Sequence, residues 1–221
     1  MKKSVTTENV RAFTVLELLF VLAMVAVFAA LLLPAYSGPR KSPMIECMSH
    51  LKQAGLAMCM FSADHSDQFP MQTSITNGGS MDFVGTGSPA PHFQAMSNYL
   101  SGDWGVLLCP TDKSKQRATK YAVISDRNIS YFLSMDATCQ TTNIILAGDR
   151  NLEVGGQLVK PGLFVLTTNA AVRWTSELHS KGRTAFGGNL LFVDGHVELA
   201  GRKLPAIMER QYLAANRLAF P

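Results

Sequence analysis

The stretch Ala12-Phe13-Thr14-Val15-Leu16-Glu17-Leu18-Leu19 opens an apolar run that continues to Leu33, immediately before Pro34. Residues 13–33 number 21, and at 1.5 Å rise per residue a helix of this length would span roughly 30 Å, the thickness of a bilayer hydrocarbon core. Glu17 is the only ionisable residue in the run. A carboxylate inside such a helix costs about 2.5 to 3.5 kcal/mol on insertion scales, so we expect it to have a partner of opposite charge.

A short basic leader, residues 1–12, precedes this run and carries Lys2, Lys3 and Arg11, which the positive-inside rule keeps in the cytoplasm. An ordinary secretory signal has a shorter apolar stretch with its small-residue cleavage site after it. Here the small residue Ala12 lies before the run, so cleavage there would leave the helix attached and make Phe13 the new N-terminus. The pattern predicts a cytoplasmic leader at 1–12 and a transmembrane or assembly helix at 13–36.

These residues resemble the start of the type IV pilins and of the type II secretion pseudopilins, including those similar to secretion protein G. Counted from Phe13, Glu17 is fifth and Pro34 is twenty-second, the registers in which that family has its glutamate and its helix-bending proline. The resemblance implies that a prepilin peptidase cuts between Ala12 and Phe13 and then methylates the amine of Phe13. The family usually has glycine where this chain has Ala12.

The resemblance also implies assembly, and Glu17 has a physical role in it. The α-amine of Phe13, with a reference pKa near 7.7 to 8.0, stays largely cationic at neutral pH and can meet Glu17 of a neighbouring subunit in a dry filament core. Removing one partner of such a pair commonly costs about 3 to 5 kcal/mol, although the intact pair adds little net stability. Glu17 would then specify register. The competing interpretation is a signal anchor with an incidental glutamate.

The predicted fold is α+β and pilin-like, with a globular head domain at 43–221. The long N-terminal helix is expected to break near 37–43 and to pack on a mainly antiparallel β-sheet. Ser42 and Pro43 suit the cap and first turn of a restarted helix. An apolar stripe on that helix comprises Cys47, Leu51, Ala54, Met58 and Phe61. We expect a surface loop at about 71–91, a C-terminal helix at 204–218, and strands at 105–109, 121–124, 129–133, 144–147, 163–166 and 189–193.

The clearest hairpin signal is Asp194-Gly195 between the apolar run 190–193 and the segment 196–199, in which polar and apolar residues alternate, and it predicts a two-residue turn. With His179 upstream and His196 after it, this segment resembles the C-terminal His...Asp-Gly-His motif of many pilin-like proteins, a motif of unknown role. His179, Asp194 and His196 are residue types that suit a metal site or an acid–base pair. Because the turn already explains Asp-Gly, we assign no catalytic residue and predict that the chain is not an enzyme.

We predict no cofactor and no metal, with calcium as the alternative because some pseudopilins bind it. Asp149 and Asp194 could contribute oxygens to calcium. Calcium takes six to eight oxygen ligands, and no segment gathers that many.

The chain has four cysteines, Cys47, Cys59, Cys109 and Cys139. The pilin resemblance favours a disulfide between Cys47 and Cys109. Four cysteines allow three full pairings, and Cys47 and Cys59 also suit a helix face as small buried hydrophobic residues.

The charge is modest, with a formal net charge of +4 and 16% charged residues, and the Lys and Arg residues are scattered. This does not favour nucleic-acid binding. The predicted function is a structural subunit of a type II secretion pseudopilus or a type IV pilus-like filament, single-pass in the inner membrane, with its head in the periplasm or in an extracellular filament. Its expected partners are the prepilin peptidase, copies of itself, other pilin-like subunits, the inner-membrane assembly platform and the membrane.

Two alternatives stay open. One is a membrane-tethered extracytoplasmic binding protein that does not polymerise. The other is a metal-assisted surface hydrolase that uses His179, Asp194 and His196.

Overall fold

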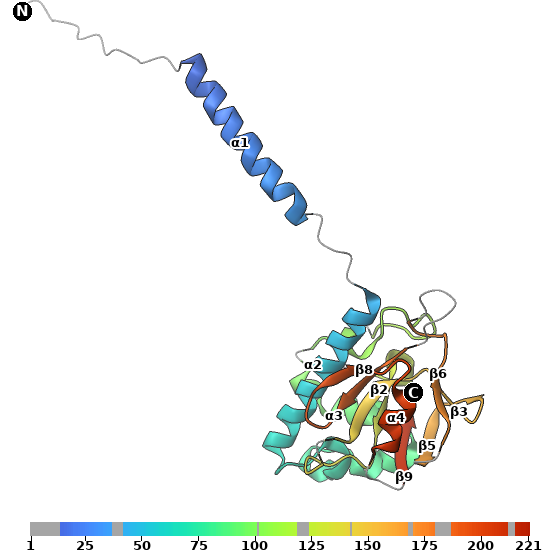
Figure 1. Ribbon diagram of the computed structural model, residues 1–221. Helices are drawn as coiled ribbons and strands as arrows, with labels where there is room; N and C mark the ends of the chain where they lie inside the picture. The colour runs from blue at the N-terminus through green and yellow to red at the C-terminus, as the bar shows by residue number, and fades with distance from the viewer. Residues whose placement is uncertain are drawn as a thin grey trace, which may run out of the picture. The chain divides into compact units, whose positions relative to one another are not determined.

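The computed structural model describes residues 14–36, 42–100, 102–118, 124–141, 143–167, 170–179, 187–211 and 215–221 (Figure 1). The chain forms two compact units, Met1–Lys41 and Ser42–Pro221. The predicted leader, the cleavage position between Ala12 and Phe13, and most of the predicted helix break lie outside the described residues.

The N-terminal unit contains one helix, α1 (Val15–Tyr36), whose backbone continues as α-helix through Pro34. Thr14 and Glu17 form a capping box at its start: the amide and hydroxyl of Thr14 each donate to Oε2 of Glu17 at 3.0 Å, and the amide of Glu17 donates to Thr14 Oγ1 at 3.3 Å. The described side chains of α1, which end at Leu31, are all exposed. Within its own unit, the described part of α1 therefore has an apolar surface that no other described residue covers.

Among the described residues, no helix combines the length and the apolarity that crossing a membrane requires. This finding contradicts the prediction of a single-pass inner-membrane protein. That prediction counted residues 13–33, but Phe13 lies outside the described residues and the described side chains of α1 stop at Leu31. The described apolar stretch is thus shorter than the about 20 residues that a spanning helix needs.

The head begins with α2 (Pro43–Asp64), which starts as predicted, with Ser42 as N-cap and Pro43 at the first position. All five residues of the predicted stripe are buried, together with Gly55, Ala57 and Ser62. The helix packs on the main sheet, chiefly against β7 (Asn189–Phe192) and β8 (Val197–Leu199). Gly55 allows this approach, because a Cβ there would lie 2.7 Å from Leu191 Cδ1.

The main sheet has six strands in the order β5-β9-β1-β2-β7-β8, and all neighbouring pairs are antiparallel. This confirms an α+β fold with a mainly antiparallel sheet. A second, three-stranded sheet has the order β4-β3-β6. The remaining strand bounds are β1 (Tyr131–Ser134), β2 (Ile145–Asp149), β3 (Leu152–Val154), β4 (Gln157–Leu158), β5 (Gly162–Thr167), β6 (Val172–Trp174) and β9 (Ala215–Phe220).

The main sheet is buried on both faces. Side chains alternate between faces along a strand, so Tyr131 and Leu133 of β1 join the core under α2, whereas Phe132 joins a second core on the opposite face. The second core contains residues of β3 and β6 and of a short helix, α4 (Leu204–Glu209). Helix, main sheet and a layer of small sheet plus helix therefore form three layers (Figure 1).

Several sequence predictions about local structure are wrong. The C-terminal segment is not one helix: α4 ends at Glu209, and β9 then inserts between β5 and β1. The predicted strand at 105–109 is largely the 3-10 helix η5 (Trp104–Leu107). Part of the predicted surface loop at about 71–91 is buried, for example Met71, Thr73 and Ser80. This region holds short helices: most of η1 (Pro70–Gln72), η2 (Ile75–Asn77), η3 (Met81–Thr86) and the start of α3 (Ala90–Ala95), with η4 (Ser97–Tyr99) and η6 (Asp126–Asn128) further on.

The Asp-Gly hairpin forms between β7 and β8, but its turn is longer than predicted. Only Gly195 has a positive φ, at 83°, and the amide of Gly195 donates to the carbonyl of Phe192 at 2.9 Å. The amide of Phe192 donates to the carbonyl of His196 at 3.0 Å, which closes a three-residue loop. Such loops pair a type I turn with a left-handed glycine.

We predict that Gly55→Ala destabilises the head despite the higher helix propensity of alanine, about 1 kcal/mol. The new methyl group meets Leu191, which is 1% exposed and has little room to move, and overpacking of this kind costs about 1 to 3 kcal/mol. Urea unfolding of Gly55→Ala, Leu191→Ala and the double variant measures this, with less than additive losses expected. A Gly55→Ala protein more stable than the wild type would contradict the close approach of α2 to β7.

Candidate functional site: a buried cluster of cysteine, aspartate and histidine

Four buried side chains with metal-binding atoms meet between α2 and the main sheet: Cys47, Cys109, Asp149 and His179. Cys47 comes from α2, Cys109 follows η5, Asp149 ends β2, and His179 follows β6. Their sulfur, oxygen and nitrogen atoms all lie within 4.8 Å of one another. Segments far apart in the sequence thus bring four donor atoms to one point.

The individual contacts are short. Cys47 Sγ donates to Asp149 Oδ1 at 3.2 Å, and His179 Nε2 lies 3.2 Å from Asp149 Oδ2. Cys109 Sγ lies 3.5 Å from the same nitrogen of His179. The side chains of Asp149 and His179 have no exposed surface, so neither group is compensated by solvent.

A second set of polar groups contacts Asp149, Cys47 and Cys109. The backbone amide and the side-chain amide of Asn189 donate to Asp149 Oδ2 at 2.6 and 3.1 Å. The hydroxyl of Tyr131 lies 3.2 Å from Cys47 Sγ, and that of Thr111 lies 3.1 Å from Cys109 Sγ. Each of these groups is placed to stabilise negative charge on the oxygen or sulfur that it contacts.

Two backbone features set the donors in place. Tyr131 pairs with Asp149 across the β1–β2 ladder, so the sheet register fixes the carboxylate beside the tyrosine hydroxyl. His179 has φ 55°, an uncommon conformation for a residue other than glycine. Backbone strain of this kind persists where surrounding contacts hold it, and it is concentrated at functional sites.

Arg150, next to Asp149, links the loops that carry the other donors. Its guanidinium donates to both carboxylate oxygens of Asp112 at 2.7 and 3.0 Å, and to Glu177 Oε2 at 3.0 Å. Asp112 is three residues beyond Cys109, and Glu177 is two residues before His179. We call Arg150, Asp112 and Glu177 the arginine clamp, because these residues tie together the segments that hold Cys109, Asp149 and His179.

The proton affinities within the cluster are strongly perturbed. Burial raises the pKa of Cys47 well above its usual value. The side-chain interaction with Cys47, helped by that with His179, lowers the pKa of Cys109 to about 5 although burial opposes this. Burial lowers the pKa of His179, but its hydrogen bonds with Asp149 and Cys109 outweigh burial and raise that pKa to about 10. Without another cation, the cluster therefore favours a thiolate at Cys109 beside a protonated His179.

The arrangement is not that of a catalytic triad. In a triad, the nucleophile and the carboxylate bind opposite nitrogens of the histidine ring. Here Cys109 and Asp149 both contact Nε2, and among the described residues Nδ1 of His179 has no hydrogen-bond partner. Cys109 and Asp149 therefore lie on the same side of the imidazole ring.

The structure brings together some of the residues singled out in the sequence and separates others. Cys47 and Cys109, the pair expected to form a disulfide, are adjacent, and both are free cysteines. Cys59 and Cys139 lie outside the cluster and are also free.

The two calcium candidates, Asp149 and Asp194, lie at opposite ends of the β2–β7 pair. Asp149 contacts Asn189 at one end, whereas Asp194 follows the end at which Phe192 pairs with Ile145. His179 joins Asp149, so the three residues of the hydrolase alternative do not converge. Asp194 instead accepts from the amide of His196 at 3.0 Å and contacts the ring of that histidine at 2.5 Å.

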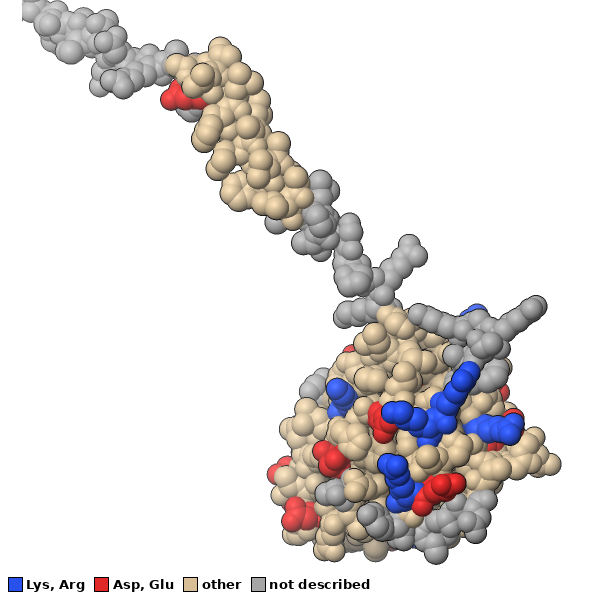
Figure 2. Space-filling model, viewed as in Figure 1, with Lys and Arg blue, Asp and Glu red and all other residues tan. Residues whose placement is uncertain are grey.

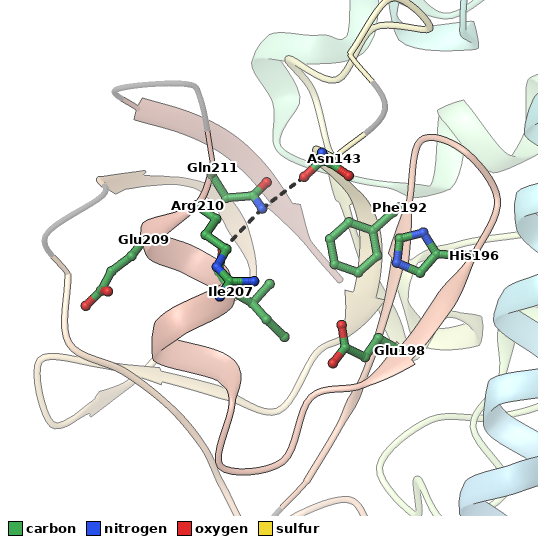
Figure 3. A pocket seen from close by; sticks show the side chains of 8 residues that line it. All are labelled: Asn143, Phe192, His196, Glu198, Ile207, Glu209, Arg210 and Gln211. Atoms are coloured by element: carbon green, nitrogen blue, oxygen red, sulfur yellow. Dashed lines mark hydrogen bonds between the residues drawn. The ribbon is translucent and has the colours of Figure 1, made fainter.

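His196 lines a separate surface hollow of about 480 Å³ between the hairpin and α4 (Figure 3). Its ring stacks on Phe192 with centroids 4.2 Å apart. Gln211 closes the opposite side, accepting from the amide of Ile145 at 2.9 Å and donating to the carbonyl of Asn143 at 3.3 Å. These contacts give the hairpin motif a packing role.

The second feature with functional meaning is the surface of α1. In the space-filling view the described part of α1 shows one acidic group and no other charged residue, and Glu17 is the only charged residue in the otherwise largely apolar sequence of the helix (Figure 2). Hydrogen bonds from the amide and then from the hydroxyl of Thr14 lower the pKa of Glu17, so it is ionised at neutral pH. On the visible face of the head, by contrast, both signs of charge are interspersed (Figure 2).

No family model, curated protein or solved structure matches this chain. What it does must therefore be inferred from its own residues.

We predict that Arg150→Ala lowers the free energy of unfolding by about 3 to 5 kcal/mol, because Asp112, whose side chain is 1% exposed, loses its counter-charge. Arg217→Ala is the matched control: Arg217 pairs with Asp136 but is 47% exposed, and such pairs contribute about 0 to 1 kcal/mol. Urea unfolding measures both, and equal losses would contradict the proposed importance of the clamp.

The arginine clamp also makes the free energy of unfolding depend on pH. Although burial raises the pKa of Asp112, its bonds with Arg150 and Ser114 outweigh burial and lower that pKa. Asp112 is thus protonated at lower pH in the folded state than in the unfolded state. Its contribution to the free energy of unfolding is complete above about pH 4 and is lost as pH falls through the folded pKa. Asp112→Asn should remove this part of the acid destabilisation.

Proposed function

We propose that this chain is a pilin-like structural subunit. In this proposal a prepilin peptidase clips it between Ala12 and Phe13, and it assembles through α1 into a filament of the type IV pilus or type II secretion pseudopilus class. The observation that carries the proposal is the character of α1: an exposed helix, apolar on all sides, with a single carboxylate at its start, attached to a head that has its own core.

The apolar surface of α1 supports helix-to-helix assembly. A helix that is apolar all round is stable only when other apolar surface covers it. The large exposed side chains, among them Leu16, Phe20 and Phe28, are between 46% and 78% exposed from Val15 to Leu31. Copies of the same helix, stacked in a filament, provide that cover and bury apolar area worth about 25 cal/mol per Å².

Glu17 supports a defined register within such a stack. An ionised carboxylate in an apolar bundle needs a cation, and cleavage after Ala12 creates one, the amine of Phe13 on a neighbouring copy. The capping box is a competing explanation, because Thr14 already uses the carboxylate within the same helix. That observation favours the second candidate, a binding protein whose helix starts with a local cap and which does not polymerise.

Two substitutions separate the roles of Glu17. Gln replaces Glu in capping boxes, so Glu17→Gln keeps the helix start and removes only the charge. Thr14→Ala keeps the charge and removes the cap, at a cost of about 0.5 to 2 kcal/mol in helix stability. We expect Glu17→Gln to abolish filaments and Thr14→Ala to retain them, as scored by electron microscopy and by the sheared, sedimentable fraction. Filaments from Glu17→Gln together with none from Thr14→Ala would mean that Glu17 serves only as a cap.

Processing is tested by the mass of the chain after co-expression with a prepilin peptidase. We expect the mass of a chain that begins at an N-methylated Phe13, and Phe13 as the first residue in N-terminal sequencing. Ala12→Leu is the control, since a bulky residue there should block cleavage. Retention of Met1 in the wild type under these conditions would refute the pilin-like proposal.

A further inference from the structure

We propose that Cys47, Cys109, Asp149 and His179 bind one divalent transition-metal ion, zinc by preference, in a closed four-ligand site that fastens α2 to the main sheet. This inference concerns the head alone and does not depend on how α1 is used.

The spacing of the donor atoms fits a tetrahedral ion. Zinc binds sulfur at about 2.3 Å and nitrogen or oxygen at about 2.0 to 2.2 Å, so the edges of a tetrahedral site measure about 3.3 to 3.8 Å. Three contacts are close to this length: Cys47 Sγ lies 3.2 Å from Asp149 Oδ1, His179 Nε2 lies 3.2 Å from the other oxygen, Oδ2, and Cys109 Sγ lies 3.5 Å from His179 Nε2. Because no pair of donor atoms exceeds 4.8 Å, small side-chain adjustments place all four at bonding distance.

The chemistry of the donors selects the ion. Two sulfurs and one imidazole nitrogen are borderline or soft ligands, which favour zinc and exclude calcium and magnesium, ions that take oxygen ligands. One carboxylate completes the set. Four protein ligands leave no open position, the arrangement of a structural site, whereas a catalytic zinc keeps a position for water.

The surrounding donors offset the charge of such a site. Two thiolates and one carboxylate around a dication leave one net negative charge in a buried place. The amides of Asn189 and the hydroxyls of Tyr131 and Thr111 all contact these ligand atoms. Groups in this position orient metal ligands, and their loss typically weakens metal affinity about 10- to 100-fold.

A bound dication would also supply positive charge beside the carboxylate of Asp149, whose side chain has no exposed surface. A cavity of about 790 Å³ on the side of the arginine clamp is lined in part by Thr111 and His179 and so lies next to the cluster.

The competing explanation is a disulfide between Cys47 and Cys109. A disulfide would use both sulfurs and leave Asp149 and His179 as a simple buried ion pair. The two explanations are mutually exclusive for one molecule, because a cystine offers no thiolate. Experiment can therefore distinguish them directly.

The test is a Co²⁺ titration of the full-length chain, purified with reductant and kept soluble in a mild detergent because α1 is apolar. We expect one Co²⁺ per chain, with the intense visible absorption of tetrahedral cobalt, a near-ultraviolet thiolate-to-cobalt band, and loss of both on adding one equivalent of Zn²⁺. Absence of these bands, or weak octahedral absorption alone, would overturn the proposal.

Variants assign the ligands. Cys109→Ser and Cys47→Ser should each lower the thiolate band by about half or abolish binding, whereas Cys59→Ser and Cys139→Ser, the two cysteines outside the cluster, should leave the spectrum unchanged. Circular dichroism checks that each variant is folded, and the wild-type titration decides the question even where one is not. An equal effect of Cys59→Ser, or a chain 2 Da lighter with Cys47 and Cys109 joined in non-reducing peptide mapping, would refute the metal site.

Discussion

The buried carboxylate of Asp149 is the constraint on which the head depends. It lies at the end of β2 with no exposed surface, and a charge in that position is tolerated only when several groups compensate it. Cys47 from α2, His179 from the loop after β6, and Asn189 from β7 all contact it. Compensating one carboxylate therefore ties α2, the loop after β6 and the start of β7 to the end of β2.

Both units of the chain carry apolar side chains that are stable only when they are removed from water, but only the head buries them itself. The head buries its apolar residues on both faces of one sheet, and the arginine clamp pairs the buried carboxylate of Asp112 with Arg150. The described side chains of α1 expose a wholly apolar surface with one carboxylate at its start. The head therefore has its own core, whereas the apolar surface of α1 needs to be covered. This arrangement is expected if the chain polymerises through its N-terminal helix, as proposed.

The sequence predicted those parts of the fold whose cause is local. The stripe from Cys47 to Phe61 follows the helical period, and all its members are buried in α2. The strands that became β1, β2, β5 and β7 are short apolar runs, and their positions were predicted to within a few residues. The last strand was missed because Ile207 and Met208 do form a helical face in α4, whereas β9 is held by pairing with β5 and β1, which no local pattern encodes.

The cluster of cysteine, aspartate and histidine could not be predicted from the sequence for a related reason. Cys109, Asp149 and His179 were each noticed, but in three separate contexts: a disulfide, a calcium ligand and a hairpin motif. A metal site can be recognised in a sequence when pairs of its ligands lie a few residues apart, as in a Cys-x-x-Cys pair. The four donors of this cluster instead come from four distant segments. Only the antiparallel order of the sheet and the left-handed backbone at His179 bring them together.

X-ray absorption at the zinc K-edge, recorded on the full-length chain after loading with one equivalent of zinc, tests the central claim most directly. The account predicts a first coordination sphere of two sulfurs at about 2.3 Å and two nitrogen or oxygen atoms at about 2.0 to 2.2 Å. A sphere of oxygen and nitrogen atoms alone, or zinc removed by a single desalting step, would contradict it. Cys47, Cys109, Asp149 and His179 would then be a hydrogen-bonded packing motif and not a metal centre.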